Sequence, residues 1–213
     1  MRNVDDKLSI YRNAAVAASY DQRWRGRRGQ ARDRRKQAAL ARALAHFPEA
    51  RSLLDVPCGT GRFRGFLTAR GLDYVGGDAS PEMLREARHK SHDARLVACD
   101  LTRLPFDDRS VDVALCIRLM HLVRDGELRA AFLRELARVS RLGVIVDYRH
   151  DRSLRVWLGR ARASLGLRHK APGALKLETI RAELEATGLT LREFVPVRRV
   201  PYLSDKIVVV AAR

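Results

Sequence analysis

Strand-like apolar runs alternate with helix-like stretches from about residue 53 to residue 146, and this alternation constrains the fold more than any other feature of the chain. We expect strands at 53–56, 72–77, 96–99, 111–116 and 144–146. Helices are expected at 61–70, after residue 80 and at 127–139. This order predicts parallel βαβ units in a sheet that helices cover on both faces.

Local signals support the helix positions. Gly71 is suited to the left-handed conformation that ends a helix. Ser80 and Pro81 are typical of an N-cap and a first helical residue. In 127–139, apolar residues recur at helical spacing on one face. They are Leu128, Ala131, Phe132, Leu136 and Val139.

The end of the chain breaks the alternation, because the strand-like runs 189–197 and 206–212 have no helix between them. We expect them to form an antiparallel pair at the sheet edge. The sequence therefore predicts an α/β fold with seven strands, mostly parallel with an antiparallel edge strand. A chain of 213 residues suits a single domain, 1–213, with a basic helical N-terminal cap at 1–49 and a basic amphipathic insertion at 151–175.

Charge and composition limit the partners and the location. The net charge of +17 comes from 36 Arg and 6 Lys, which favours anionic partners such as nucleic acid or an anionic membrane surface. A GC-rich genome would also raise the Arg content. No apolar run approaches the roughly 20 residues of a membrane span, and residues 1–20 lack a signal-peptide core. We therefore expect a cytoplasmic protein.

The three cysteines, Cys58, Cys99 and Cys116, fit no zinc pattern, and their odd number argues against a disulfide framework. We expect small apolar residues at or near strand ends rather than redox groups, and no metal site.

A glycine-containing loop follows the first expected strand. Gly59 and Gly61 would let a ligand approach the backbone closely. A dinucleotide fingerprint would need a third glycine at 64, where Arg64 stands, and no P-loop ending is present. Asp55 would repel a pyrophosphate at this strand end. It suits a ligand that carries a positively charged amine or sulfonium.

Two further carboxylates follow the next two strands. Asp78 lies 19 residues after Gly59, close to the spacing at which an acid receives ribose hydroxyls. Asp100 follows the third strand. Three neighbouring parallel strands thus each end in or beside an aspartate. This arrangement predicts a cleft that accepts a nucleoside bearing an amino acid.

The ordered set of motifs resembles the class I S-adenosylmethionine-dependent methyltransferases, which have a Rossmann-like fold, and in particular the small-molecule subgroup related to ubiquinone-pathway C-methyltransferases. The resemblance covers about residues 18–148. Its carriers are Tyr20-Asp21, the segment 54–61, Gly77-Asp78-Ala79-Ser80, Asp100-Leu101, Leu104-Pro105-Phe106, Asp112-Val113-Ala114, Leu119-Met120-His121-Leu122 and the segment 135–139.

The resemblance implies S-adenosyl-L-methionine as the cofactor and assigns roles around it. The loop would hold the methionine part through Asp55, Pro57, Cys58, Gly59, Thr60 and Gly61. Asp78 and Ala79 would lie at the ribose, and Asp100 and Leu101 at the adenine. Ile117 and Arg118 would line the methionine side, and Tyr20 would close over the cofactor.

Two departures from the family pattern stand out. Pro57 replaces the usual first glycine of the loop, a change that an extended position tolerates. The usual Lys-Pro-Gly-Gly turn before the fifth strand is replaced by Ser140-Arg141-Leu142-Gly143. The second departure weakens the subgroup assignment more than the fold assignment.

Methyl transfer from a sulfonium mainly requires orientation, and a general base is needed only when the acceptor loses a proton. The candidate bases are His121, Tyr148 and His150, which follow the fourth and fifth strands. We select His121 as the catalytic candidate, with a purely structural histidine as the alternative.

The insertion after the fifth strand carries one apolar helical stripe with arginines beside it. The stripe comprises Leu154, Trp157, Leu158, Ala161 and Leu165, and the arginines are Arg152, Arg155, Arg160, Arg162 and Arg168. Three interpretations stay open. The segment packs on its own domain as a lid over the acceptor pocket, or meets an anionic membrane and a lipid-like acceptor, or contacts nucleic acid.

The sequence therefore predicts a methyltransferase acting on a small-molecule or lipid-linked acceptor, located in the cytoplasm or peripheral to a membrane. An RNA methyltransferase is the alternative within enzymes. A non-catalytic cofactor-binding partner or sensor protein is the alternative from another class.

Overall fold

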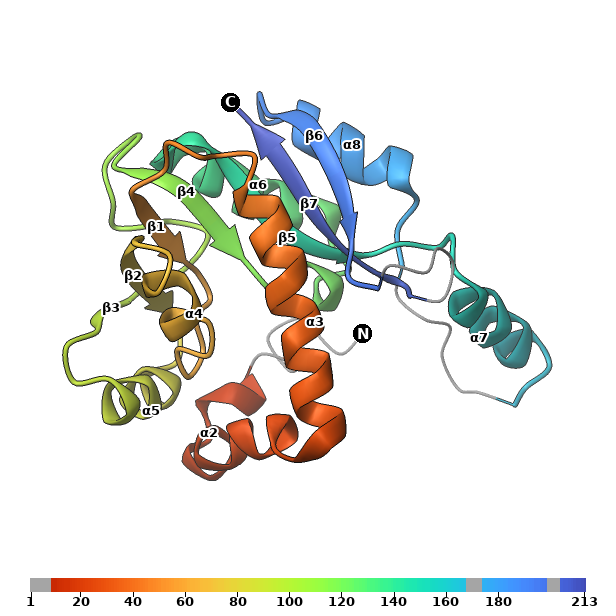
Figure 1. Ribbon diagram of the computed structural model, residues 1–213. Coiled ribbons are helices and arrows are strands. Elements are labelled where there is room, and N and C mark those ends of the chain that lie inside the picture. The colour runs from red at the N-terminus through yellow and green to blue at the C-terminus, as the bar shows by residue number, and fades with distance from the viewer. Residues whose placement is uncertain (1–8, 168–173, 199–203) are drawn as a thin grey trace.

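The computed structural model describes residues 9–167, 174–198 and 204–213. A seven-stranded sheet with the order β3-β2-β1-β4-β5-β7-β6 forms the centre of the molecule (Figure 1). Its strands are β1 (Ser52–Asp55), β2 (Asp73–Asp78), β3 (Arg95–Ala98), β4 (Val111–Cys116), β5 (Ser140–Arg149), β6 (Thr190–Pro196) and β7 (Lys206–Ala212). The predicted α/β fold is confirmed.

Strands β1 to β5 are parallel, and β7 runs antiparallel to both of its neighbours, β5 and β6. The expected antiparallel pair is therefore present, with β6 at the edge and the antiparallel strand one place inside it. β5 is longer than the expected 144–146, because it pairs with β7 from Gly143 opposite Ala212 to Arg149 opposite Lys206.

Alternate strand residues feed two hydrophobic layers, as a sheet covered on both faces requires. On one face, Leu53 and Ile145 pack with α3 (Gly26–Leu44) and α4 (Arg64–Thr68). On the other face, Leu54 and Val144 pack with α6 (Gly126–Val139) and α8 (Leu177–Glu185). The parallel strands consequently direct their carboxyl ends to one edge, where the ligand-binding crevice of such folds lies.

Two helices begin within one residue of the expected position, α5 (Pro81–Lys90) and α6, and a third does not. Ser80 caps α5, with its hydroxyl accepting the Met83 N–H at 3.2 Å. The helix expected from residue 61 begins only at Arg64. Gly61 has a φ of +68°, which a right-handed helix cannot contain, so 61–63 form turns instead.

The N-terminal cap consists of η1 (Ser9–Arg12), α2 (Ala14–Ser19), η2 (Tyr20–Trp24) and α3. Gly29 lets η2 lie against α3, because a Cβ there would come within 2.6 Å of the Trp24 backbone. Lys36 ties α3 to β5 through a buried ion pair with Asp147 at 2.7 Å. The cap is thereby fixed beside the carboxyl ends of the strands.

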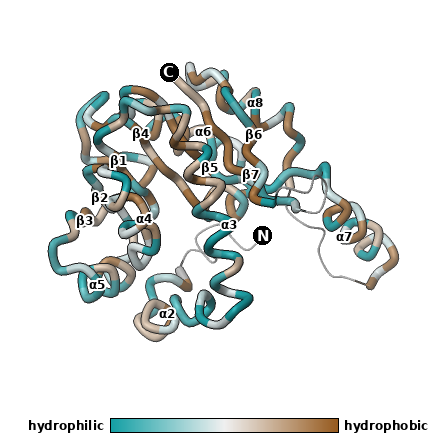
Figure 2. Tube along the Cα trace, viewed as in Figure 1, coloured by the Kyte–Doolittle hydropathy of each residue, from teal (hydrophilic) through white to brown (hydrophobic). Residues whose placement is uncertain are grey.

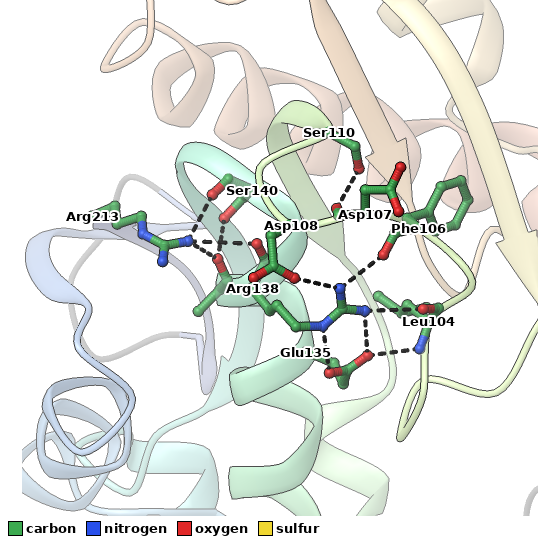
Figure 3. A network of polar contacts seen from close by, with 10 residues as sticks. Leu104, Phe106, Asp107, Asp108, Ser110, Glu135, Arg138, Ser140 and Arg213 are labelled. Atoms are coloured by element: carbon green, nitrogen blue, oxygen red, sulfur yellow. Dashed lines mark hydrogen bonds and ion pairs between the residues drawn. The ribbon is translucent and has the colours of Figure 1, made fainter.

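Two of the motifs that carry the family resemblance contact each other (Figure 3). Arg138 on α6 donates to the carbonyls of Leu104 and Phe106, at 2.9 and 2.8 Å, and pairs with Glu135. Glu135 in turn accepts the Leu104 N–H at 2.7 Å. The network anchors the loop between β3 and β4 to α6.

Helix α7 (Leu154–Ser164) lies apart from the sheet (Figure 1), and hydrophobic segments occur along it (Figure 2). It contacts the domain through Val156 and Gly159. The predicted apolar stripe faces the other way, with Trp157 64% and Leu165 72% exposed. Residues 168–173 of the predicted insertion, Arg168 among them, lie outside the described residues. In the part of the chain that the structure describes, no helix is long and apolar enough to cross a membrane.

Candidate functional site

A cavity of about 360 Å³ lies at the carboxyl ends of β1, β2, β3 and β4. Ten of the thirteen predicted cofactor-binding residues line it. These are Tyr20, Pro57, Cys58, Gly59, Asp78, Ala79, Asp100, Leu101, Ile117 and Arg118. The volume falls within the range of small-molecule sites in proteins.

The loop after β1 exposes backbone to the cavity. Gly59 has a φ of +55°, and a Cβ at this position would meet no atom within 4 Å. The open space beside it is available to a ligand. The Gly59 N–H donates to Asp78 at 2.7 Å, which ties the loop to the end of β2.

Asp78 is 8% exposed and lies at the junction of β2 and α5. One carboxylate oxygen accepts the Gly59 N–H and the other accepts the Ser80 N–H at 2.9 Å. Burial raises the pKa of Asp78, although these N–H groups oppose the shift. Each oxygen keeps a lone pair that can accept a hydroxyl from a ligand.

Asp100 lies in an exposed turn after β3. Its Oδ1 accepts both the N–H and the hydroxyl of Thr102, at 2.8 and 2.9 Å, and Oδ2 has no hydrogen-bond partner among the described residues. Apolar side chains lie nearby, and Leu101, Met83 and Phe132 line the same cavity. A planar aromatic group with polar edges would suit this combination.

Tyr20 lies over the cavity from the N-terminal cap. Its ring packs edge-on against Tyr11, with 5.9 Å between centroids. The Arg23 guanidinium lies 4.3 Å from the Tyr20 centroid, and that of Arg118 lies at 5.7 Å. Burial raises the pKa of Tyr20, so its hydroxyl stays neutral at physiological pH.

Arg118 and Arg62 separate this cavity from a second one, because both residues line both. Arg118 adopts a φ of +71°, and its N–H donates to Asp147 at 2.6 Å. Arg62 lies 3.4 Å from the Trp24 ring centroid and pairs with Asp33. The Trp24 ring thus fixes the Arg62 guanidinium at the boundary between the cavities.

Three predicted cofactor residues do not line the cavity. Asp55 is 1% exposed and accepts the Tyr74 hydroxyl at 3.1 Å. The Thr60 hydroxyl donates to Asp21 at 2.8 Å, and Gly61 lies against Ala87 of α5. Burial raises the pKa of Asp55 to about 7, although Tyr74 opposes the shift. These residues contact the protein around the loop and do not face the cavity.

The candidate bases are separated by the structure. His121, in η3 (Met120–Leu122), and Tyr148 line the second cavity. The Tyr148 hydroxyl donates to Glu183 at 3.3 Å, and burial raises its pKa well above the usual value. His150 is buried, with Nε2 2.9 Å from the Ser204 carbonyl, and lines neither cavity. Of the two candidate histidines, His121 alone lines one of these two cavities.

Burial lowers the pKa of His121 to about 4. Asp147 opposes the shift, whereas Arg149, Arg118 and Lys206 add to it. The ring is consequently neutral at physiological pH.

All three cysteines are free thiols, as expected from their number. Cys58 and Cys99 line the first cavity, and Cys116 is buried in β4. Among the residues with described positions, no group of three or more His, Cys, Asp or Glu could hold a metal ion.

Several cavity residues were missing from the sequence predictions. Arg62 directly follows the glycine loop and Cys99 precedes Asp100, so adjacency to a predicted residue could have identified both. Tyr11, Leu128 and Phe132 come from distant elements. Only the packing of the N-terminal cap and of α6 brings them to the cavity, and no local sequence pattern predicts this packing.

Residues 54–146 match the family model described as a methyltransferase domain. The chain is 34% identical over 103 residues to an uncharacterized methyltransferase of Mycobacterium tuberculosis, an alignment that covers 48% of this chain and 42% of that protein. It is 36% identical over 111 residues to a demethylmenaquinone methyltransferase of Beutenbergia cavernae, with 52% and 45% covered. The matched segment thus spans less than half the length of these relatives.

The fold is similar to that of solved methyltransferases. The magnesium protoporphyrin IX methyltransferase of Synechocystis, solved with bound S-adenosylhomocysteine, matches with a TM-score of 0.73 and 16% identity. That match covers 99% of this chain and 100% of the other. A methyltransferase from Archaeoglobus fulgidus matches with a TM-score of 0.64 and 16% identity, covering 91% and 98%.

Proposed function

We propose that the chain is a class I S-adenosylmethionine-dependent methyltransferase that transfers a methyl group to a small-molecule acceptor. The observation that carries this proposal is the cavity in which the glycine loop, Asp78 and Asp100 meet at the strand ends. Demethylmenaquinone and magnesium protoporphyrin methyltransferases among the relatives favour a small-molecule acceptor. We therefore also propose the small-molecule subgroup for this chain.

The cavity residues fit S-adenosylmethionine, which supplies an activated methyl group on a sulfonium. Asp78 has free lone pairs for ribose hydroxyls, and Asp100 Oδ2 lies at the polar edge of an apolar wall formed by Leu101 and Met83. The open space at Gly59 would receive the amino-acid part. Ala79, Cys58 and Pro57 complete these surfaces.

Orientation is the main catalytic contribution that we assign to the chain. Tyr20 and Ile117 would exclude water, and Arg118 would hold the boundary with the second cavity. His121 would accept a proton at a ring nitrogen if the acceptor must lose one. Its lowered pKa keeps it in the neutral, proton-accepting form.

Calorimetric titration with S-adenosylmethionine and S-adenosylhomocysteine tests the proposal. Wild-type protein should bind both, and Asp78→Ala should bind them at least tenfold more weakly. Asp107→Ala is a matched control, because Asp107 is exposed and lines neither cavity. Binding by neither ligand would contradict the proposal. Binding without turnover on any acceptor would favour the non-catalytic sensor.

A nucleic-acid acceptor is the second enzyme candidate, and the exposed arginines of the N-terminal cap favour it. They are Arg23, Arg25, Arg27, Arg28, Arg34 and Arg35. Against it, Trp157 is the one exposed aromatic side chain within the described ranges, which leaves little surface for base stacking. RNA binding that weakens steeply with added salt would support this candidate.

The exposed face of α7 supports a membrane encounter as part of the proposal. Leu154, Trp157 and Leu158 point away from the domain, and Arg155 and Arg162 flank them. An apolar helix face bordered by arginines matches an anionic lipid surface in both polarity and charge. Such contact would place the enzyme peripheral to a membrane and give it access to a lipid-linked acceptor.

A further inference from the structure

A second cavity, of about 730 Å³, adjoins the proposed cofactor cavity and shares Arg62 and Arg118 with it. Its walls come from η2, α3, the end of β5, α7 and the start of β7. These elements are far apart in the sequence, so the cavity is a product of the tertiary fold. Its position beside the cofactor cavity makes it the natural acceptor site.

The walls of this cavity carry a large excess of positive charge. Ten of its lining residues are Arg or Lys and two are Asp. Asp147 pairs with Lys36, Asp205 lies 3.6 Å from Arg149, and Arg62 pairs with Asp33. Seven cations have no carboxylate partner within the described segments. They are Arg23, Arg32, Arg35, Arg118, Arg155, Arg198 and Lys206.

We infer that this cavity binds the acceptor through an oxyanion, a carboxylate or a phosphate. The inference rests on the proposed methyltransferase function, whose acceptor it specifies. Guanidinium groups form paired hydrogen bonds with both kinds of oxyanion, and the arginines here converge from several elements. A neutral acceptor would leave this charge unbalanced.

Unsatisfied donors in the same walls support the inference. Trp24 Nε1 and Arg149 Nε are buried and have no hydrogen-bond acceptor among the described residues. The Asp205 carboxylate that pairs with Arg149 lies 3.6 Å from this Nε, beyond hydrogen-bond distance. Both residues line the second cavity. Buried N–H groups normally have a partner, so two without one beside a single cavity indicate a site that lacks its acceptor group.

The electrostatics of neighbouring groups also favour a bound anion. Burial lowers the pKa of Lys206, and the nearby Arg149 and Lys36 lower it further. Cations of these walls also contribute to the low pKa of His121, since Arg149, Arg118 and Lys206 all lower it. Positive charges therefore repel one another across the cavity, and a bound anion would relieve that repulsion.

The size of the cavity favours a small anion over a nucleic-acid backbone. The volume lies within the range of small-ligand sites. Trp24 is covered by the guanidinium groups of Arg62, at 3.4 Å, and Arg32, at 5.6 Å, so its ring is not free to stack on a base.

Three matched probes test the inference on the full chain saturated with S-adenosylhomocysteine. Phenyl phosphate and benzoate carry the two oxyanions, and benzamide is their neutral counterpart. Titration calorimetry should detect at least one oxyanion, bound at least tenfold more tightly than benzamide. Comparison of phosphate with carboxylate identifies the preferred acceptor group.

Substitutions in and outside the cavity localise the binding. Arg35→Gln and Arg155→Gln should each weaken the preferred anion about tenfold, as loss of one charge-assisted hydrogen bond predicts. Arg34→Gln and Arg162→Gln are the controls, because both residues are exposed on the same helices but do not line the cavity. The controls should bind as the wild type does.

Equal affinity for benzamide and both anions would overturn the inference. An equal loss of anion affinity in the cavity variants and in the control variants would also overturn it. Tight binding of an RNA oligonucleotide without binding of either small anion would assign the surface to nucleic acid and also overturn it. Binding of S-adenosylhomocysteine is measured separately. If the protein does not bind S-adenosylhomocysteine, the methyltransferase proposal is contradicted. If it binds S-adenosylhomocysteine but neither anion, this inference alone is contradicted.

Discussion

The carboxylate of Asp78 accepts the backbone N–H of Gly59 at 2.7 Å, so the acid after β2 and the glycine loop after β1 form one unit. The same carboxylate accepts the Ser80 N–H at the start of α5. Asp78 therefore has two functions that can be separated, positioning the loop and offering lone pairs to a ligand.

Replacing Asp78 by Asn or Ala tests these functions. Asp78→Asn keeps one acceptor oxygen but removes the charge, and it should weaken S-adenosylhomocysteine roughly tenfold. Asp78→Ala also releases the loop and should weaken the ligand roughly a hundredfold, as loss of two hydrogen bonds to a charged group predicts. Calorimetry gives both values, and equal affinity for the Ala variant and wild type would contradict the role of Asp78.

The buried Asp55 predicts a dependence of stability on pH. Its pKa is raised to about 7 in the fold, whereas an unfolded Asp titrates near 4. The folded state therefore binds the extra proton between these values, and the free energy of unfolding contributed by this group falls as the pH rises from about 4 to 7. The full difference is of the order of 4 kcal/mol.

Asp55→Asn should remove this fall and stabilise the cofactor-free protein at pH 8. Urea unfolding of wild type and variant at pH 5 and pH 8 measures the effect. The difference between the two proteins should grow with pH. A difference independent of pH would place the pKa of Asp55 near its ordinary value.

The predicted elements near the site follow local patterns, which explains why they were found. The apolar runs of β1 and β4 are buried in the sheet, Asp78 is the last residue of β2, and Asp100 follows β3, close to where the spacing indicated. The parallel direction of the strands brings these acids to one edge of the sheet, and alternation of strands and helices is enough to imply that direction.

The orientation of α7 and the second cavity depend on information that local patterns lack. Helical spacing shows which residues share a face, but not which face the domain covers. The domain covers Val156 and Gly159 and leaves Trp157 in solvent. The cationic cavity likewise requires distant segments to meet, such as Arg35 on α3 and Lys206 on β7.

The ion pair between Lys36 and Asp147 predicts a large loss of stability when one partner is removed. Both side chains are buried, 8% and 6% exposed. Burial would raise the pKa of Asp147, but Lys36, His121 and the Arg118 N–H lower it overall, so the carboxylate is charged. Lys36→Met leaves that charge unpaired and should cost about 3–5 kcal/mol.

Urea unfolding at pH 7 measures this cost, and a double variant is the control. Lys36→Met combined with Asp147→Asn removes both charges while keeping an acceptor for the Arg118 N–H. It should recover most of the lost stability. If the double variant is as unstable as Lys36→Met, packing rather than charge explains the loss.

His121 predicts a distinctive titration. With its pKa lowered to about 4, the ring is neutral above about pH 5, and turnover of an acceptor that loses a proton should rise through pH 4 and then level off. His121→Ala should lower that turnover at least a hundredfold. His89→Ala is the control, because His89 is exposed on α5 and lines neither cavity. Full turnover by His121→Ala with intact cofactor binding would remove the catalytic role.

The exposed stripe of α7 predicts binding to anionic vesicles. The protein should float with vesicles of phosphatidylglycerol and phosphatidylcholine but not with phosphatidylcholine alone, because Arg155 and Arg162 border the apolar face. Trp157→Ser with Leu158→Ser removes exposed apolar area whose burial in the membrane would contribute a few kcal/mol, so it should abolish flotation. Ile10→Ser is the matched control, since Ile10 is 54% exposed on η1, outside α7. Flotation that the α7 variant retains, or that the control equally loses, would show that this stripe does not meet the membrane.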